Sequence, residues 1–208
     1  MTVPLLQNGL LDLSKTPDHL IPIAQRNAIQ SPLLRLPAEI RSKIFQYATG
    51  GGHFLIAMPH EGNITDLRRS GVYLPQVSRQ IYSETATLIF ENNTFALDVD
   101  RMLISWVPYR SEQLLPLFIN ALIPAQRASI RELEFIGLNQ LLPLAHRFQD
   151  REPPLTAVFP NLGVIWLAEG YEEIFGPLAR RFPDMNASDF VNYIVTSGEH
   201  KRVDIAWY

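Results

Sequence analysis

The sequence predicts an α+β fold in which helices cover one side of a small mixed or antiparallel sheet. Two proline-led amphipathic segments in the first half favour helices, and short apolar runs typical of strands recur along the chain. In the second half the two kinds of segment alternate without the long regular βαβ units of a doubly wound sheet. With 208 residues, 47% of them hydrophobic and 19% charged, the chain can bury one sizeable core.

The first helix is expected to begin at Pro37. Proline suits the first helical position because the N–H that it lacks would have no partner there. Leu36, Ile40 and Ile44 recur at four-residue spacing and form one apolar stripe. The glycines at 50–52 then end the helix, since glycine accepts the left-handed conformation that follows many helices.

The second helix is expected to run from Pro75 to the asparagines at 92–93, with apolar residues over a wide arc. The segment 49–73 between the two helices is interpreted as a hairpin insertion. Its first strand is an apolar run at 53–58, and its return strand lies near 71–74.

The remaining chain is divided by turn residues into further short elements. The sequence predicts helices at 98–107, 111–123, 124–128, 138–148, 171–182 and 186–196, and strands at 94–97, 130–136, 163–168 and 203–208. The expected organisation is an irregular arm at 1–30, a helical region at 31–97 that contains the insertion, and an α+β part at 98–208 of the same compact domain.

The composition excludes several classes of function. A net charge of −3 gives no general attraction to nucleic acid. The absence of cysteine excludes a disulfide framework, a thiolate nucleophile and sulfur-ligated zinc. No run reaches the ~20 apolar residues of a membrane span, and residues 1–13 lack the basic start of a signal peptide. We therefore expect no metal, cofactor, nucleic acid or membrane partner, and a location in the cytoplasm or nucleus rather than outside the cell.

The two helical blocks, LPAEIRSKIF and LPQVSRQIYSETATLIFENNTFAL, together resemble a large group of fungal F-box-like proteins. The likeness continues weakly into IRELEF and FPNLGVIWL, which look like strands of the same group. The residues that match the shared pattern are Leu36, Pro37, Glu39, Ile40, Arg41, Ile44, Phe45, Leu74, Val77, Arg79, Gln80, Ile81, Tyr82, Glu84, Phe90, Asn93, Thr94 and Phe95.

The resemblance implies a protein-interaction module, because the leucine-proline helix of an F-box binds a Skp1-type adapter of a ubiquitin ligase. The chain would then act as a substrate receptor. By position, adapter binding falls on Leu34, Leu36, Pro37, Ile40, Ile44 and Phe45. The insertion is longer than the corresponding F-box connection, and Ile81 stands where F-boxes usually have tryptophan.

The apolar stripe of the first helix has two interpretations. It is either part of the protein's own core or a surface for the adapter. The sequence favours the core, because this helix shows only one good apolar stripe and a self-contained domain needs it.

A small enzyme or ligand-binding protein, for example in specialised metabolism, is the alternative function. Its pocket would be built by the 49–73 insertion and the apolar helix at 111–123. A histidine–carboxylate pair from His53, His60 and Glu61, with Tyr73 nearby, could provide acid–base chemistry. A solvent-facing loop explains these residues more simply. A secreted effector on the same scaffold is a third interpretation, disfavoured by the start of the chain.

Overall fold

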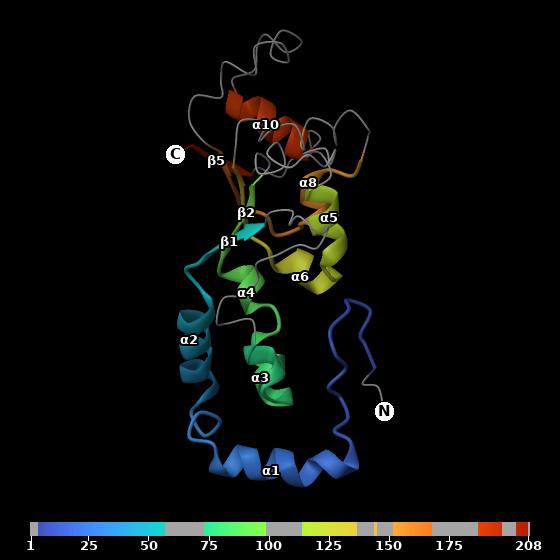
Figure 1. Ribbon diagram of the computed structural model, residues 1–208, viewed down its shortest axis with the longest axis vertical. Helices are drawn as coiled ribbons and strands as arrows, with labels where there is room; N and C mark the ends of the chain where they lie inside the picture. Colours follow the sequence, from blue (N-terminus) through green and yellow to red (C-terminus); the bar gives the residue numbers. More distant parts are fainter. Residues whose placement is uncertain are drawn as a thin grey trace, which may run out of the picture.

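The computed structural model describes residues 4–56, 73–98, 114–136, 144, 152–167, 187–196 and 203–207. The molecule is elongated, with helices at one end and a sheet at the other (Figure 1). The sheet has five parallel strands in the order β1-β2-β3-β4-β5. The strands are β1 His53–Ile56, β2 Thr94–Asp98, β3 Glu132–Ile136, β4 Val164–Leu167 and β5 Asp204–Trp207.

The α+β class is confirmed, but the prediction of a mixed or antiparallel sheet is wrong. A long connection that carries at least one helix separates each strand from the next. Connections of this length return the chain to the same end of the sheet, so successive strands run parallel. The predicted hairpin also fails at its described end, because residues 74–76 form a 3-10 helix and β1 pairs with β2.

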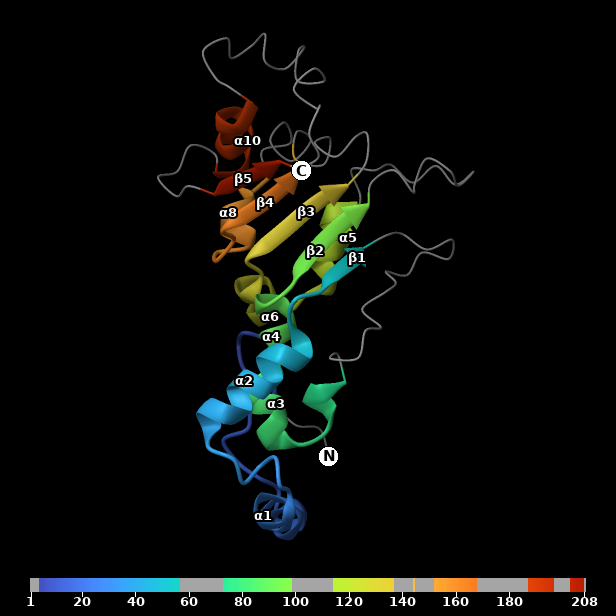
Figure 2. The ribbon, with the colours of Figure 1, turned by 90° about the vertical axis from the view of Figure 1, so that its left-hand side faces the viewer.

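The helices that follow β2 and β3 cover one face of the sheet. The helices of this half are α5 Leu114–Ala121, α6 Pro124–Ser129, α8 Leu155–Val158 and α10 Ala187–Thr196. Figure 2 shows α5, α6 and α8 behind the strands, and α10 packs against α8 and β5. The opposite face of the sheet turns toward the viewer in that figure and is covered by no helix among the described residues.

The main core lies between the sheet and these helices. Alternate strand residues point into it, as the two-residue period of a strand requires. Phe95 is fully buried at its centre, and its ring packs against those of Phe54, Phe90 and Phe118 at centroid distances of 5.5, 5.6 and 5.7 Å. This aromatic cluster joins two strands, α5 and the end of the helical region.

Six short elements of the helical end fall within the described residues. They are η1 Asp18–Leu20, α1 Ile21–Gln30, α2 Ala38–Thr49, η2 Leu74–Gln76, α3 Arg79–Thr85 and α4 Leu88–Glu91. The single second helix predicted from Pro75 is therefore three separate pieces. Ser78 is extended and its hydroxyl accepts a hydrogen bond from the backbone N–H of Ile81, which starts α3 as a new helix.

Asn93 fixes the junction between the helical end and the sheet. Its Nδ2 donates to the carbonyl of Thr49 at 2.5 Å and to that of Ile89 at 2.8 Å, while its Oδ1 accepts from the N–H of Gly52 at 2.7 Å. Gly51, at φ +72°, lets the chain turn there after α2. One buried amide thus holds the ends of α2 and α4 beside the start of β1.

The N-terminal arm runs along the body to α1, which crosses the far end of the molecule (Figure 1). The arm is held through hydrogen bonds of its own main chain: the N–H of Ala125 donates to the carbonyl of Asn8, and the N–H of Leu11 donates to the hydroxyl of Tyr82 at 2.9 Å. The helix at its end, α1, occupies the last third of the segment that was expected to be an irregular arm.

Several predicted elements are found where they were expected. They are the short helix after Ile123, the strands β2 to β5 and the helix that ends at Thr196. The helices predicted at 98–107, 138–148 and 171–182 lie almost entirely outside the described residues.

Replacing Asn93 with alanine should lower the free energy of unfolding by about 1–3 kcal/mol, because it removes the buried partner of two carbonyls and one N–H. Urea denaturation measures the change. Asn92→Ala is the matched control, since the Nδ2 of Asn92 is buried without a hydrogen-bond partner. Equal losses in the two variants would contradict the role given to Asn93.

Candidate functional site

The helix α2 has an inner and an outer face. Arg41, Phe45 and Thr49 are buried and follow one another at four-residue spacing. Ile40 and Ile44 lie on the other side and are exposed. The apolar stripe recognised in the sequence is therefore the outer face of α2. The inner face begins with a buried arginine, Arg41.

The inner face is held by an ion pair between Arg41 and Glu84 of α3. Nε of Arg41 donates to Oε2 of Glu84 at 2.9 Å, and Nη2 donates to Oε1 at 2.7 Å. The remaining nitrogen, Nη1, donates to the backbone carbonyls of Leu34 and Leu36. One guanidinium thus positions α2, α3 and the turn that leads into α2.

The ion pair shifts the pKa values of both Arg41 and Glu84. The hydrogen bonds from Arg41 lower the pKa of Glu84 against the opposing effect of its partial burial. The hydrogen bonds to Glu84 raise the pKa of Arg41. Both shifts favour the charged forms, so the pair is ionised at neutral pH.

The outer face is open to solvent. Ile40 is 46% exposed, Ile44 39% and Tyr47 89%. The interpretation of the stripe as internal core is therefore wrong for Ile40 and Ile44. The physical reason is that Phe45 and the Arg41–Glu84 ion pair make the contacts between α2 and the rest of the protein. The domain therefore does not need the aliphatic stripe for its own packing.

Exposed apolar side chains gather at this end of the molecule. Among the described residues, the large hydrophobics that are exposed all precede α3, except Leu117. They are Leu5, Leu6, Ile21, Ile23, Ile29, Ile40, Ile44, Tyr47, Tyr73 and Val77. An open groove of about 210 Å³, lined by residues that include Ile23, Leu34 and Val77, lies between α1 and the start of α3. Such a concentration is typical of an interaction surface.

The six residues predicted to bind an adapter separate into three groups by burial. Pro37, Ile40 and Ile44 are exposed, and Leu34 and Leu36 are half-buried. Phe45 is only 1% exposed and belongs to the interior, so a partner cannot reach it without unfolding.

The residues of the alternative catalytic site are not brought together. His60 and Glu61 lie outside the described residues. The side chain of His53 is 70% exposed at the start of β1 and pairs with Glu134, and Tyr73 is exposed near η2. The groove found between α1 and α3 is also not the pocket predicted from 49–73 and 111–123.

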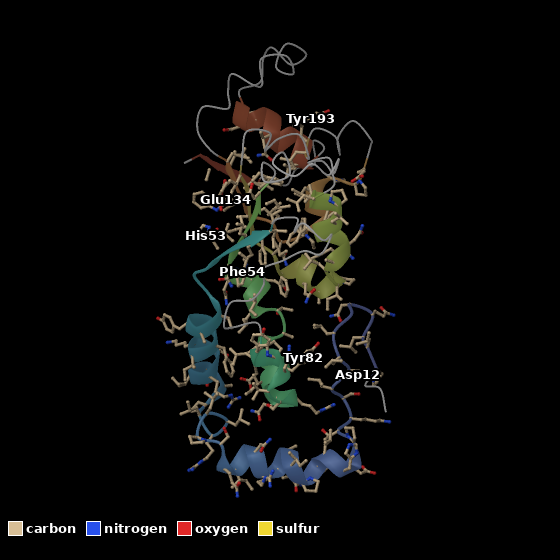
Figure 3. The ribbon with its side chains drawn as sticks, viewed as in Figure 1. Asp12, His53, Phe54, Tyr82, Glu134 and Tyr193 are labelled. Atoms are coloured by element: carbon tan, nitrogen blue, oxygen red, sulfur yellow. The ribbon has the colours of Figure 1, made fainter. Side chains whose placement is uncertain are left out.

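The sheet face opposite the core carries a largely buried polar network that the sequence reasoning missed. Oε2 of Glu132 accepts hydrogen bonds from the hydroxyl of Thr94 and from Nε1 of Trp166, both at 3.0 Å. Nδ1 of His53 lies 3.2 Å from Oε2 of Glu134 (Figure 3). The signal in the sequence was the alternation ELE at 132–134, which places both glutamates on the face opposite the core.

Comparisons with known proteins add no assignment. No family model, curated protein or solved structure matches the chain at a significant level. Within the part of the chain that the structure describes, no helix is suited to crossing a membrane, and no three His, Asp or Glu side chains are grouped to hold a metal ion.

Glu84→Gln should remove a contribution to stability that depends on pH. Because the pKa of Glu84 is lowered in the folded protein, the contribution is fully present above the ordinary value near 4.5 and is lost as the pH falls through the folded value. Urea unfolding at neutral and acidic pH should show a difference between wild type and variant that shrinks on acidification.

Glu39→Gln is the control for this experiment, because Glu39 is an exposed carboxylate of the same helix. Its effect on the free energy of unfolding should be small at every pH. A wild-type advantage over Glu84→Gln that stays constant from neutral to acidic pH would contradict the ionised pair.

Proposed function

We propose that this chain is an F-box-like protein-interaction module, in which α2 docks on a Skp1-type adapter and the chain serves as a substrate receptor of a ubiquitin ligase. The single observation that carries the proposal is the exposure of Ile40 and Ile44 on a helix whose opposite face is already packed. This role places the protein in the cytoplasm or nucleus.

The cost of leaving such a stripe uncovered supports the proposal. Aliphatic side chains gain free energy by leaving water, at roughly 25 cal/mol per Å² of apolar surface. A partner helix or groove that covered Ile40, Ile44 and the half-buried Leu36 would recover this free energy. Amphipathic anchors at three- and four-residue spacing are the usual form of such an interface.

The arrangement of the molecule also supports a receptor. The exposed apolar side chains lie mostly before α3, at the helical end or in the arm, whereas the polar network lies on the sheet, on the far side of the Asn93 junction (Figure 1). Two separate surfaces allow a protein to hold two partners at once. We expect the helical end to bind the adapter, which leaves the sheet half of the molecule, beyond the Asn93 junction, clear of it.

The variants Ile40→Asp and Ile44→Asp should each weaken adapter binding by at least about 2 kcal/mol, roughly thirtyfold, because each places a charge in an apolar contact. The free energy of unfolding should change by less than about 1 kcal/mol, since both side chains are exposed in the free protein. Calorimetry with a purified Skp1-type adapter and urea denaturation measure the two quantities.

Two further variants complete the test. Ser42→Asp adds the same charge at another exposed position of α2 and should leave adapter binding intact. Phe45→Ala should destabilise the fold by about 3–5 kcal/mol, because it empties a buried site. The proposal fails if intact wild-type protein does not bind the adapter under conditions in which a true F-box does.

A further inference from the structure

The arm, residues 4–17, and the helix α1 that it leads to lie on the molecule without entering it (Figure 1). No residue from 4 to 30 is buried, and Ile29 of α1 is 72% exposed. The main hydrophobic core contains no residue of this segment. Segments that bury few side chains are the first to open in a native protein. The departure of the arm and α1 would therefore cost none of the core packing.

The helix α1 lies over an apolar surface that it does not close. Ile23 of α1, Leu34 of the following turn and Val77 at the end of η2 all line the open groove of about 210 Å³. A firmly packed helix would fill such a space with side chains, because protein interiors leave few voids. The packing of α1 on this surface is thus too slight to hold the helix in place.

The surface under α1 adjoins the exposed stripe of α2. Leu34 is half-buried and belongs to the turn that leads into α2, and Arg41 fastens this turn through the carbonyl of Leu34. Ile40 and Ile44 follow on the outer face of the same helix. Leu34 is also one of the residues predicted to bind the adapter. A partner that covers the stripe of α2 and reaches Leu34 would meet α1.

The arm holds the start of α1 against the body. In the described part of the chain, three hydrogen bonds tie the arm down: two are those to α6 and α3 described above, and in the third Nη2 of Arg79 donates to the carbonyl of Lys15 at 2.8 Å. Each ends on the main chain of the arm, which water can serve equally well, so each bond contributes only modestly. The arm is therefore a tether that small changes can release.

Gly9 fits the arm closely onto the body. Its φ is +86°, and a Cβ at this position would lie 2.8 Å from the Cβ of Ile123. Residues with a side chain rarely adopt this backbone conformation, and carbon atoms that are not bonded do not approach so closely. The arm can rest on Ile123 because glycine stands at residue 9.

We propose that the arm is a strap that holds α1 over the apolar surface at Leu34, and that release of the strap opens this surface to the adapter. The device is autoinhibitory, because α1 and the partner compete for the same residues. The turn at 31–37 still joins α1 to α2, so the released helix can swing aside and return. This inference rests on the proposed function where it names the adapter as the competitor.

The size of the effect depends on how often the strap is open. When only a fraction of the molecules can bind, the apparent affinity falls in proportion to that fraction. With the strap open in about one molecule in ten, full release raises the affinity for the adapter about tenfold.

Gly9→Ala and Tyr82→Phe release the strap of the full chain by different means. The first introduces the clash with Ile123, and the second removes the hydroxyl that accepts from the N–H of Leu11. Hydrogen exchange is measured at the contact that each substitution leaves untouched: the amide of Leu11 in Gly9→Ala and the amide of Ala125 in Tyr82→Phe. Exchange there should be at least about fivefold faster than in wild type.

Two further measurements follow the surface under α1. The fluorescence of an anilinonaphthalene sulfonate dye, which binds exposed apolar surface, should rise about twofold in both variants. Calorimetry with a purified Skp1-type adapter should show binding about fivefold tighter than that of wild type.

Gly51→Ala is the matched control. Gly51 has a similar φ of +72°, but no atom lies within 4 Å of the position of its Cβ, and it belongs to the junction after α2 rather than to the arm. The variant therefore carries the strain of the left-handed conformation without a clash. Its hydrogen exchange at Leu11 and Ala125, its dye fluorescence and its adapter affinity should match those of wild type. Urea denaturation verifies that each variant is folded.

The outcomes separate the strap from the proposed function. The strap is overturned if the two variants exchange and bind dye as wild type does, or if Gly51→Ala behaves as they do. Faster exchange with an adapter affinity equal to that of wild type also overturns the inference, since α1 would then guard nothing that the adapter needs. Faster exchange and stronger dye binding in a chain that never binds the adapter uphold the strap and overturn the proposed function.

Discussion

The ion pair between Arg41 and Glu84 is the interaction on which the helical end depends. The main hydrophobic core lies under the sheet and does not extend to α2 or α3, so these helices cannot rely on it for their position. Arg41 compensates by joining α2, α3 and the carbonyls of Leu34 and Leu36. A partly buried guanidinium is stable there because hydrogen bonds replace the water that it loses.

This pair also explains why α2 can expose aliphatic residues. Either of two faces of α2 could have been buried: the face that contains Ile40 and Ile44, or the face that contains Arg41 and Phe45. The ion pair, together with the burial of Phe45, selects the second. The apolar stripe is then left on the surface, where it can serve a partner. The same polar contact therefore fixes the helical end and creates the candidate binding surface.

The residues that carried the family resemblance have two different roles in the structure: most stabilise the fold, and a few lie on the surface. Arg41, Glu84, Asn93 and Phe95 hold the scaffold through the ion pair, the junction between helices and sheet, and the aromatic cluster. Ile40, by contrast, is exposed to solvent and does not stabilise the scaffold through any of these contacts. A pattern shared through such residues describes mainly how the chain folds. The function must be tested at the exposed positions, since comparisons provide no relative from which to transfer it.

The sequence by itself determined the local elements, with the start of α2 placed one residue early: Pro37 is the N-cap and the helix begins at Ala38, and the end of α2 at the glycines, the α6 helix and the short apolar strands lie where they were predicted. Proline, glycine and hydrophobic period act within a few residues, so they can be read directly. Only the tertiary structure decided the parallel order of the strands, the outer face of α2 and the meeting of His53 with Glu134 and of Glu132 with Trp166. These features depend on contacts between distant segments, and periodicity does not say which of two faces a neighbour will cover.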